Sequence, residues 1–181
     1  IAKLIDVIET QTELYLILEY GGANSYITIY SQNRNTDSQK LNKTVYIVIA
    51  EALLYLHDLD IVHRDIKAEN ILINRHRQLK LIDFGFSLRC KKNGTIDTFC
   101  GTPTYMAPEI VSKIDHCPVY TDMWSLGILF YVMLQGNYPF RAKNENDLFE
   151  KIKKGHFEYI HNDNSKESKK FIENLLKVNP L

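Results

Sequence analysis

The segment from Trp124 to Leu134 is almost entirely apolar, and it constrains the fold more than any other part of the chain. A helix that is hydrophobic all round must be buried on every side, so we expect a central helix surrounded by other elements. The longest apolar run within it, Leu126 to Leu134, is too short to cross a bilayer of roughly 30 Å. The segment therefore predicts the centre of a globular core and no transmembrane span.

Weaker patterns predict the elements around this helix. The polar stretch from Ser31 to Thr44 is expected to be a solvated loop that leads into a helix. A few strands followed mostly by helices make the expected fold class α+β. From their apolar periodicity we expect strands at Leu4 to Ile8, Leu14 to Leu18, Ile71 to Ile73 and Leu79 to Ile82, and helices at Val45 to Asp58, Asn144 to Lys154 and Ser165 to Lys177.

Charge and cysteine content limit the partners and the compartment. Because 22 Lys and Arg residues balance 22 Asp and Glu residues, no net field holds the chain on nucleic acid or on an anionic membrane. We expect neither as a partner. Cys90, Cys100 and Cys117 form no CxxC pair and no even disulfide framework, so we expect a reducing, intracellular and cytoplasmic setting.

Three short motifs carry the chemistry, and their order along the chain is informative. They are His63-Arg64-Asp65-Ile66-Lys67-Ala68-Glu69-Asn70, then Asp83-Phe84-Gly85, then Ala107-Pro108-Glu109. The chain resembles the protein kinase family, in which such motifs form the catalytic loop, the metal-binding loop and the end of the activation segment. The resemblance runs from near Leu4 to the last residue. It implies a protein kinase-like fold, mostly the helical large lobe with a remnant of the small-lobe sheet.

The resemblance implies that the γ-phosphoryl group of ATP is transferred to a hydroxyl. Positioning and charge stabilisation supply most of the acceleration in such a transfer. Asp65 would orient and deprotonate the acceptor hydroxyl, and Lys67 would place its ammonium group on the γ-phosphate. Asn70 and Asp83 would hold Mg²⁺ through hard oxygen ligands. ATP and Mg²⁺ are therefore the expected cofactors, and Asp65, Lys67 and Asn70 the expected catalytic residues.

The same resemblance assigns supporting roles. His63 would pack beneath Phe84, so we expect it to be structural and mostly buried, while Gly85 completes the metal-binding loop. Asp122 would accept hydrogen bonds from the backbone of the catalytic loop. Glu109 would lie at the end of the activation segment, in a structural role.

Two features of the resemblance concern substrate and regulation. Lys67 and the run Gly101-Thr102-Pro103-Thr104-Tyr105 look like those of serine/threonine kinases, so the expected partners are proteins with Ser or Thr acceptors. Thr102 would hydrogen-bond both Asp65 and Lys67. Arg64, beside the catalytic aspartate, implies control by phosphorylation, with Thr98 the expected site and an upstream kinase the expected partner. Thr95 is the second choice.

Nucleotide-binding residues are expected near the first glycines. Leu14 to Tyr20 followed by Gly21 resembles the last small-lobe strand and the hinge. Leu18 would be the gatekeeper, the Glu19 carbonyl and the Gly21 amide would face adenine, and Leu72 would form an apolar floor. The alternative is that Leu18 and Leu72 are ordinary core residues.

Some hallmarks of the family are absent from the sequence. No GxGxxG loop is present, and Lys3 lies too close to Glu19 to be the ATP-binding lysine. We therefore expect an incomplete domain that is inactive alone, with residues 1–20 a small-lobe remnant and hinge start and residues 21–181 a C-terminally truncated large lobe. The apolar faces of the first two strands would be exposed, and Glu109 would lack an arginine partner.

Within the family, the Ala68-Glu69-Asn70 ending and the Thr98-to-Pro103 segment resemble the calmodulin-dependent and AMP-activated kinase-like group. A competing hypothesis is a pseudokinase or interaction module that keeps the large lobe only as a binding surface. Asp65, Lys67, Asn70 and Asp83 are all intact, which favours the enzyme, because a module without catalysis has no need of magnesium ligands. Sequence upstream of Ile1 with a GxGxxG turn and a strand lysine would decide between the two.

Overall fold

The computed structural model describes residues 1–22, 24–25, 36–91, 94–161 and 164–179. Within these ranges short strands dominate the first half and helices the second, which confirms the predicted α+β class. The strands are β1 Leu4–Glu9, β2 Leu14–Leu18, β3 Asn24–Ser25, β4 Ile61–Val62, β5 Ile71–Ile73, β6 Leu79–Leu81 and β7 Leu88–Arg89. The helices are α2 Thr36–Asp58, α3 Pro108–Val111, α4 Pro118–Gln135, α5 Glu145–Lys154 and α6 Lys166–Leu175, with 3₁₀ turns at Ala68–Asn70 and Pro103–Tyr105.

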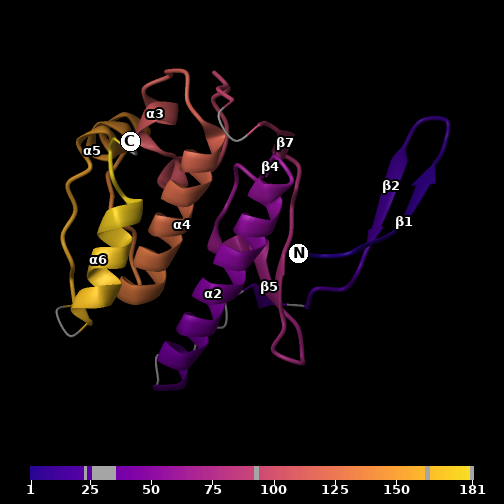
Figure 1. The fold of residues 1–181 in the computed structure, drawn as a ribbon, viewed down its shortest axis with the longest axis horizontal. Helices are drawn as coiled ribbons and strands as arrows, with labels where there is room; N and C mark the ends of the chain where they lie inside the picture. The colour runs from indigo at the N-terminus through magenta and orange to yellow at the C-terminus, as the bar shows by residue number, and fades with distance from the viewer. Residues whose placement is uncertain (23, 26–35, 92–93, 162–163, 180–181) are drawn as a thin grey trace.

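The predicted N-terminal hairpin is present and projects from the body of the molecule (Figure 1). β1 and β2 pair antiparallel, with Leu4 opposite Leu18 and Glu9 opposite Leu14. Every residue of both strands is exposed, although most are apolar. This confirms the predicted exposure of their apolar faces, and such strands are ready templates for association with another chain.

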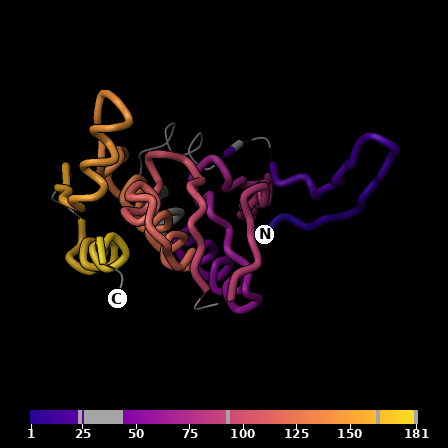
Figure 2. Tube along the Cα trace, turned by 90° about the horizontal axis from the view of Figure 1, so that it is seen from above, coloured from indigo at the N-terminus to yellow at the C-terminus, as the bar shows by residue number. Residues whose placement is uncertain are grey.

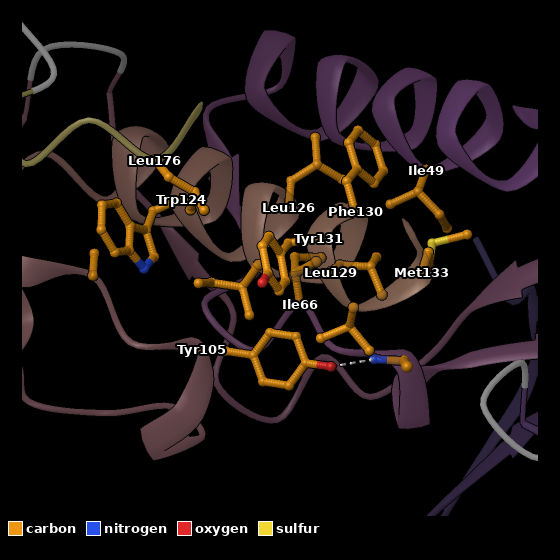
Figure 3. Close-up of a cluster of buried hydrophobic side chains, with 14 of the residues drawn as sticks. Ile49, Ile66, Tyr105, Trp124, Leu126, Leu129, Phe130, Tyr131, Met133 and Leu176 are labelled. Carbon is orange, nitrogen blue, oxygen red and sulfur yellow. Dashed lines mark hydrogen bonds between the residues drawn. The ribbon is translucent and has the colours of Figure 1, made fainter. Parts of the chain in front are cut away.

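Helix α4 is the centre of the core, as its apolar sequence predicts. Almost all of its side chains are buried, and it lies between α2 and α6 (Figure 1). Figure 3 shows Leu126 and Phe130 of α4 close to Ile49 of α2 in this cluster. Burying each such side chain contributes about 1.5–3 kcal/mol. No helix in the described ranges is both long and apolar enough to cross a membrane.

Close packing of α4 on α6 depends on a glycine. A Cβ atom placed on Gly127 would lie 2.8 Å from Leu175 Cβ and 2.8 Å from Leu176 Cδ2, closer than real carbon atoms pack. The helix therefore tolerates the usual conformational cost of glycine because no larger residue fits there.

Several predicted boundaries differ from the structure, most of them by one or two residues. α2 already begins at Thr36, inside the stretch expected to be a loop. Lysine and glutamine are good helix formers, so polar residues can extend an amphipathic helix into solvent. Strand β6 ends at Leu81 and α6 ends at Leu175, earlier than predicted, while residues 31–35 lie outside the described ranges.

Candidate active site

The β5–β6 hairpin places two of the motif residues at one end. The strands are antiparallel, with Ile71 opposite Leu81, so the start of β5 meets the end of β6. Asn70 immediately precedes β5, and the Ile82 N–H, just after β6, donates to the Asn70 carbonyl oxygen at 3.0 Å. Asp83 follows at once. The two expected metal ligands are thus brought to the same end of this hairpin.

His63, in the first motif, contacts Phe84 in the second. Its side chain is fully buried, and its ring meets the Phe84 ring edge-on at 4.9 Å between centroids. The Asp65 N–H donates to His63 Nδ1 at 3.3 Å, so the proton is on Nε2, which donates to the Ile82 carbonyl at 3.1 Å. Burial lowers the pKa of His63 and keeps the ring neutral. The contact between His63 and Phe84 confirms the expected packing.

The Asp65 carboxylate is the meeting point of three side chains. Oδ1 accepts a hydrogen bond from the Thr102 hydroxyl at 2.8 Å. Oδ2 lies 2.7 Å from Lys67 Nζ and accepts from Asn70 Nδ2 at 3.1 Å. Lys67 Nζ also donates to Thr102 Oγ1 at 3.0 Å. Both hydrogen bonds expected of Thr102 are therefore present.

The same contacts set the protonation of Asp65. The residue is only 4% exposed, and burial alone would raise the pKa of its carboxyl group. The hydrogen bonds from Lys67 and Thr102 outweigh this and hold the pKa below its usual range. Asp65 is therefore buried and ionised at neutral pH, and its oxygens accept hydrogen bonds.

Asn70 and Asp83 supply oxygen atoms that suit Mg²⁺. The Asn70 amide nitrogen is bound to Asp65, and within the described ranges its Oδ1 has no hydrogen-bond partner. Asp83 is exposed, and its Oδ1 accepts the Gly85 N–H at 3.2 Å. Mg²⁺ in phosphate sites is usually held by one or two protein oxygens together with phosphate oxygens and water. This pair of donors fits that pattern.

Asp122, in the first half of α4, holds the first motif in shape. Its side chain is buried, and its Oδ1 accepts the Arg64 N–H at 2.8 Å while its Oδ2 accepts the His63 N–H at 2.9 Å. Arg64 has a φ of 66°, a conformation that costs a non-glycine residue about 1–3 kcal/mol and persists only where the surroundings enforce it. The two hydrogen bonds provide that enforcement.

His57 was missed by sequence analysis, although a signal was available. Its Nε2 lies 2.9 Å from Asp122 Oδ2, so it completes the set of donors around this carboxylate. His57 falls four residues after Leu53, on the buried stripe of α2. A polar side chain on an apolar stripe implies a buried hydrogen-bond partner.

Tyr105 is a second residue that sequence analysis did not single out. Its hydroxyl accepts the Ala68 N–H at 3.4 Å, as the dashed line in Figure 3 shows. The Ser125 hydroxyl of α4 donates to its carbonyl oxygen at 2.9 Å. Burial raises the pKa of Tyr105. The tyrosine thus joins the first motif, the segment around Thr102 and the central helix.

Residues on both sides of Thr98 contact the rest of the molecule. Ile96 pairs with His116 in an isolated antiparallel bridge, and the Phe99 ring meets Phe149 of α5 at 6.1 Å. Thr98 itself is exposed. Arg64 Nε donates to the Phe86 carbonyl at 2.5 Å, and the structure has no hydrogen bond between Arg64 and Thr98.

At the other edge of the site, Gly21 lies against Leu72. A Cβ atom on Gly21 would be 2.8 Å from Leu72 Cδ1, so a larger residue there would have to displace the Leu72 side chain. Leu18 is 50% exposed, like the rest of β2. Glu19 Oε1 accepts the Lys3 N–H at 2.8 Å and lies 2.9 Å from Lys80 Nζ. The hydrogen bond from Lys80 is the main reason that the pKa of Glu19 is lowered.

Glu109 is partly buried, and burial raises its pKa. No Lys or Arg of the described ranges forms an ion pair with it.

Known proteins of one family match the chain over almost its whole length. The family model for the protein kinase domain matches residues 1–181. The chain is 37% identical over 181 residues to a probable serine/threonine-protein kinase, MARK-A, of Dictyostelium discoideum. It is 39% identical over 191 residues to the serine/threonine-protein kinase DCLK3 of Mus musculus, and 38% identical over 190 residues to that of Homo sapiens. Each comparison covers 99% of this chain and only 17%, 23% and 28% of the respective relative.

Proposed function

The chain belongs to the protein kinase family, and we propose that it is the part of a serine/threonine kinase that brings an acceptor hydroxyl to the terminal phosphate of ATP. The observation that carries this proposal is the contact of the Asp65 carboxylate with Lys67, Asn70 and Thr102. The names of the relatives support Ser or Thr as the acceptor.

Asp65 is proposed to bind the acceptor hydroxyl and take its proton. Its lowered pKa keeps it ionised at neutral pH, so it can orient the O–H by accepting its hydrogen bond. Proton transfer to a weakly basic carboxylate is useful only late in the transfer, when the acceptor oxygen has become acidic by bonding to phosphorus. The first task of Asp65 is therefore orientation.

Lys67 is proposed to stabilise the charge that gathers on the transferred group. Its ammonium nitrogen lies between Asp65 Oδ2 and Thr102 Oγ1, so it is held beside the acceptor position. A fixed cation in a site with little water stabilises developing negative charge without reorganisation. Mg²⁺ held by Asn70 and Asp83 would neutralise the phosphates of bound ATP.

Gly21 and Leu72 are proposed to contact the adenine ring. The Leu72 side chain lies close to the Gly21 backbone, and the Glu19 carbonyl and the Gly21 N–H would supply the hydrogen-bonding groups. Residues 1–20 would then be a small-lobe remnant that ends at the hinge, and residues 21–181 would belong to the large lobe. We also propose a cytoplasmic setting, which the three free cysteines support.

Replacement of Thr102 by valine should shift the pH dependence of activity. The change removes one of the hydrogen bonds that lower the pKa of Asp65. A raised pKa means that Asp65 becomes protonated at a higher pH, so the acid limb of the kcat/KM profile should move upward. Thr102→Ser keeps the hydroxyl and should retain the original limb. An unmoved limb in Thr102→Val would contradict the assigned role of Asp65.

Phosphorylation of Thr98 by an upstream kinase is proposed to switch the enzyme on. Thr98 is exposed to such a kinase, and a dianionic phosphate there could draw the Arg64 guanidinium away from the Phe86 carbonyl. Thr98→Ala in the complete protein should lower kcat several-fold after treatment with the upstream kinase, whereas Thr95→Ala should not. Equal activity of Thr98→Ala and wild type would refute this regulation.

The proposed activity is tested by transfer of radiolabelled phosphate from [γ-³²P]ATP. The complete protein, with Mg²⁺, is given peptides that differ only in a Ser, Thr or Tyr acceptor. Transfer to Ser and Thr but not to Tyr is the expected result. Binding of ATP without transfer to any acceptor would favour the alternative, an interaction module without catalysis.

A further inference from the structure

A groove lined by basic side chains runs beside α5, at the end of the molecule opposite the β1–β2 hairpin (Figures 1 and 2). It has two adjoining parts, with volumes of about 610 and 940 Å³, and Arg141, Lys151 and Lys154 line both. Lys143 lines the first part. The segment after α4 and the C-terminal half of α5 together supply these four cations.

None of these cations forms an ion pair with a carboxylate of the described ranges, although the hydrogen bond from Lys153 lowers the pKa of Glu150 and the charge of Lys154 adds to this effect. Lys151 Nζ donates to the Arg141 carbonyl oxygen at 2.7 Å, and Arg141 Nη1 donates to Asn137 Oδ1 at 3.0 Å. Lys143 and Lys154 form neither a hydrogen bond nor an ion pair with a described residue. The charge of the groove is therefore available to an outside ligand.

Two of the three carboxylates that line the groove, Asp147 and Glu150, have other partners, and the third, Glu158, lines only the second part. Glu150 Oε1 lies 2.9 Å from Lys153 Nζ, and Asp147 Oδ2 accepts a hydrogen bond from Asn144 Nδ2 at 2.8 Å. Asp147 also lies in the first turn of α5, where the helix dipole stabilises a negative charge. A concave surface focuses the field of the remaining cations, so the groove should attract an anionic segment.

One wall of the groove is apolar and leads toward the candidate active site. Phe140 and Phe157 form part of this wall, with their ring centroids 6.0 Å apart. Tyr138 also lines it and meets the Tyr105 ring edge-on at 5.6 Å. Since the Tyr105 hydroxyl contacts the Ala68 N–H of the catalytic loop, the groove adjoins the surface on which a substrate would lie.

We propose that this groove binds an acidic stretch of the protein substrate, at a distance from its acceptor residue. The inference rests on the proposed kinase function and specifies its substrate class. A peptide suits the groove better than a nucleic acid does, because the chain as a whole has no net charge that would hold a long polyanion beyond the groove. A peptide can place apolar side chains on the aromatic wall and carboxylates on the cations.

The test compares two serine peptides with the complete protein. They share the residues around the acceptor and differ in a remote run that is glutamate in one and glutamine in the other. The glutamate peptide should have a KM lower by about tenfold, with kcat unchanged, since exposed charge pairs contribute modestly and mainly to association. The double variant Lys143→Glu/Lys154→Glu should abolish this advantage, and Lys170→Glu on α6 should not.

Binding of the same peptides, labelled with a fluorophore and followed by anisotropy, separates this inference from the proposed function. If neither peptide is phosphorylated, the kinase proposal fails. Preferential binding of the glutamate peptide would still support the proposal that the groove binds an acidic segment. Equal affinity for the two peptides, or loss of the preference in Lys170→Glu alone, would overturn it. Tighter binding of a labelled oligouridylate than of the glutamate peptide would also overturn it.

Discussion

Asp65→Asn should lower kcat for phosphate transfer by about 10³-fold while leaving the protein folded. Asparagine has the shape of aspartate but cannot accept the proton of the acceptor hydroxyl. The carboxylate now accepts hydrogen bonds from Lys67 and Thr102. Asparagine would turn an NH₂ group, which cannot accept a hydrogen bond, toward one of these two donors. The orientation of the acceptor and the fixed position of the Lys67 cation should both be lost.

The measurement is the rate of ³²P transfer to a serine peptide at saturating ATP. Asp115→Asn, the same change at an exposed aspartate, is the matched control and should retain full activity. Thermal unfolding of both variants distinguishes a chemical defect from a folding defect. If Asp65→Asn kept more than about a tenth of the wild-type rate, the role of Asp65 as the group that orients the acceptor would be wrong.

Asp122→Ala should destabilise the protein by about 3–5 kcal/mol. The change leaves two buried backbone N–H groups, those of His63 and Arg64, and the His57 ring without their acceptor. It also releases Arg64 from its left-handed conformation. Since domains of this size are stable by only about 5–15 kcal/mol, much of the stability would be lost.

Urea denaturation of wild type, Asp122→Asn and Asp122→Ala measures this effect. Asp122→Asn keeps one oxygen acceptor and should lie between the other two. Asp115→Ala, at the surface, should unfold like wild type. A denaturation midpoint for Asp122→Ala equal to that of wild type would show that the carboxylate does not hold the loop.

The features that could be predicted from sequence are those set by local pattern. The apolar run in α4 predicts a buried central helix because no other arrangement removes its side chains from water. The two short apolar runs separated by a polar stretch predict the strands of the β1–β2 hairpin, although all of their residues are exposed. The roles of His63 and Thr102 came from the family resemblance, and the predicted contacts of both are present.

Other features depend on contacts between distant segments, which no local pattern reveals. The hydrogen bond of His57 with Asp122 joins residues 65 positions apart. Tyr105 reaches Ala68 across the site, and Lys80 pairs with Glu19 from a different hairpin. The cationic groove also escaped the sequence analysis, because Arg141 and Lys154 come together only when the segment after α4 turns back along α5.

The most direct test of the account is a crystal structure of the complete protein with Mg²⁺, a non-hydrolysable ATP analogue and a serine peptide. We expect Asn70 and Asp83 oxygens at about 2.0–2.1 Å from Mg²⁺. The Asp65 carboxylate should lie within about 2.6–3.2 Å of the serine hydroxyl, in line with the terminal phosphate. A metal bound without Asn70 and Asp83, or a serine hydroxyl out of reach of Asp65, would contradict the central claim.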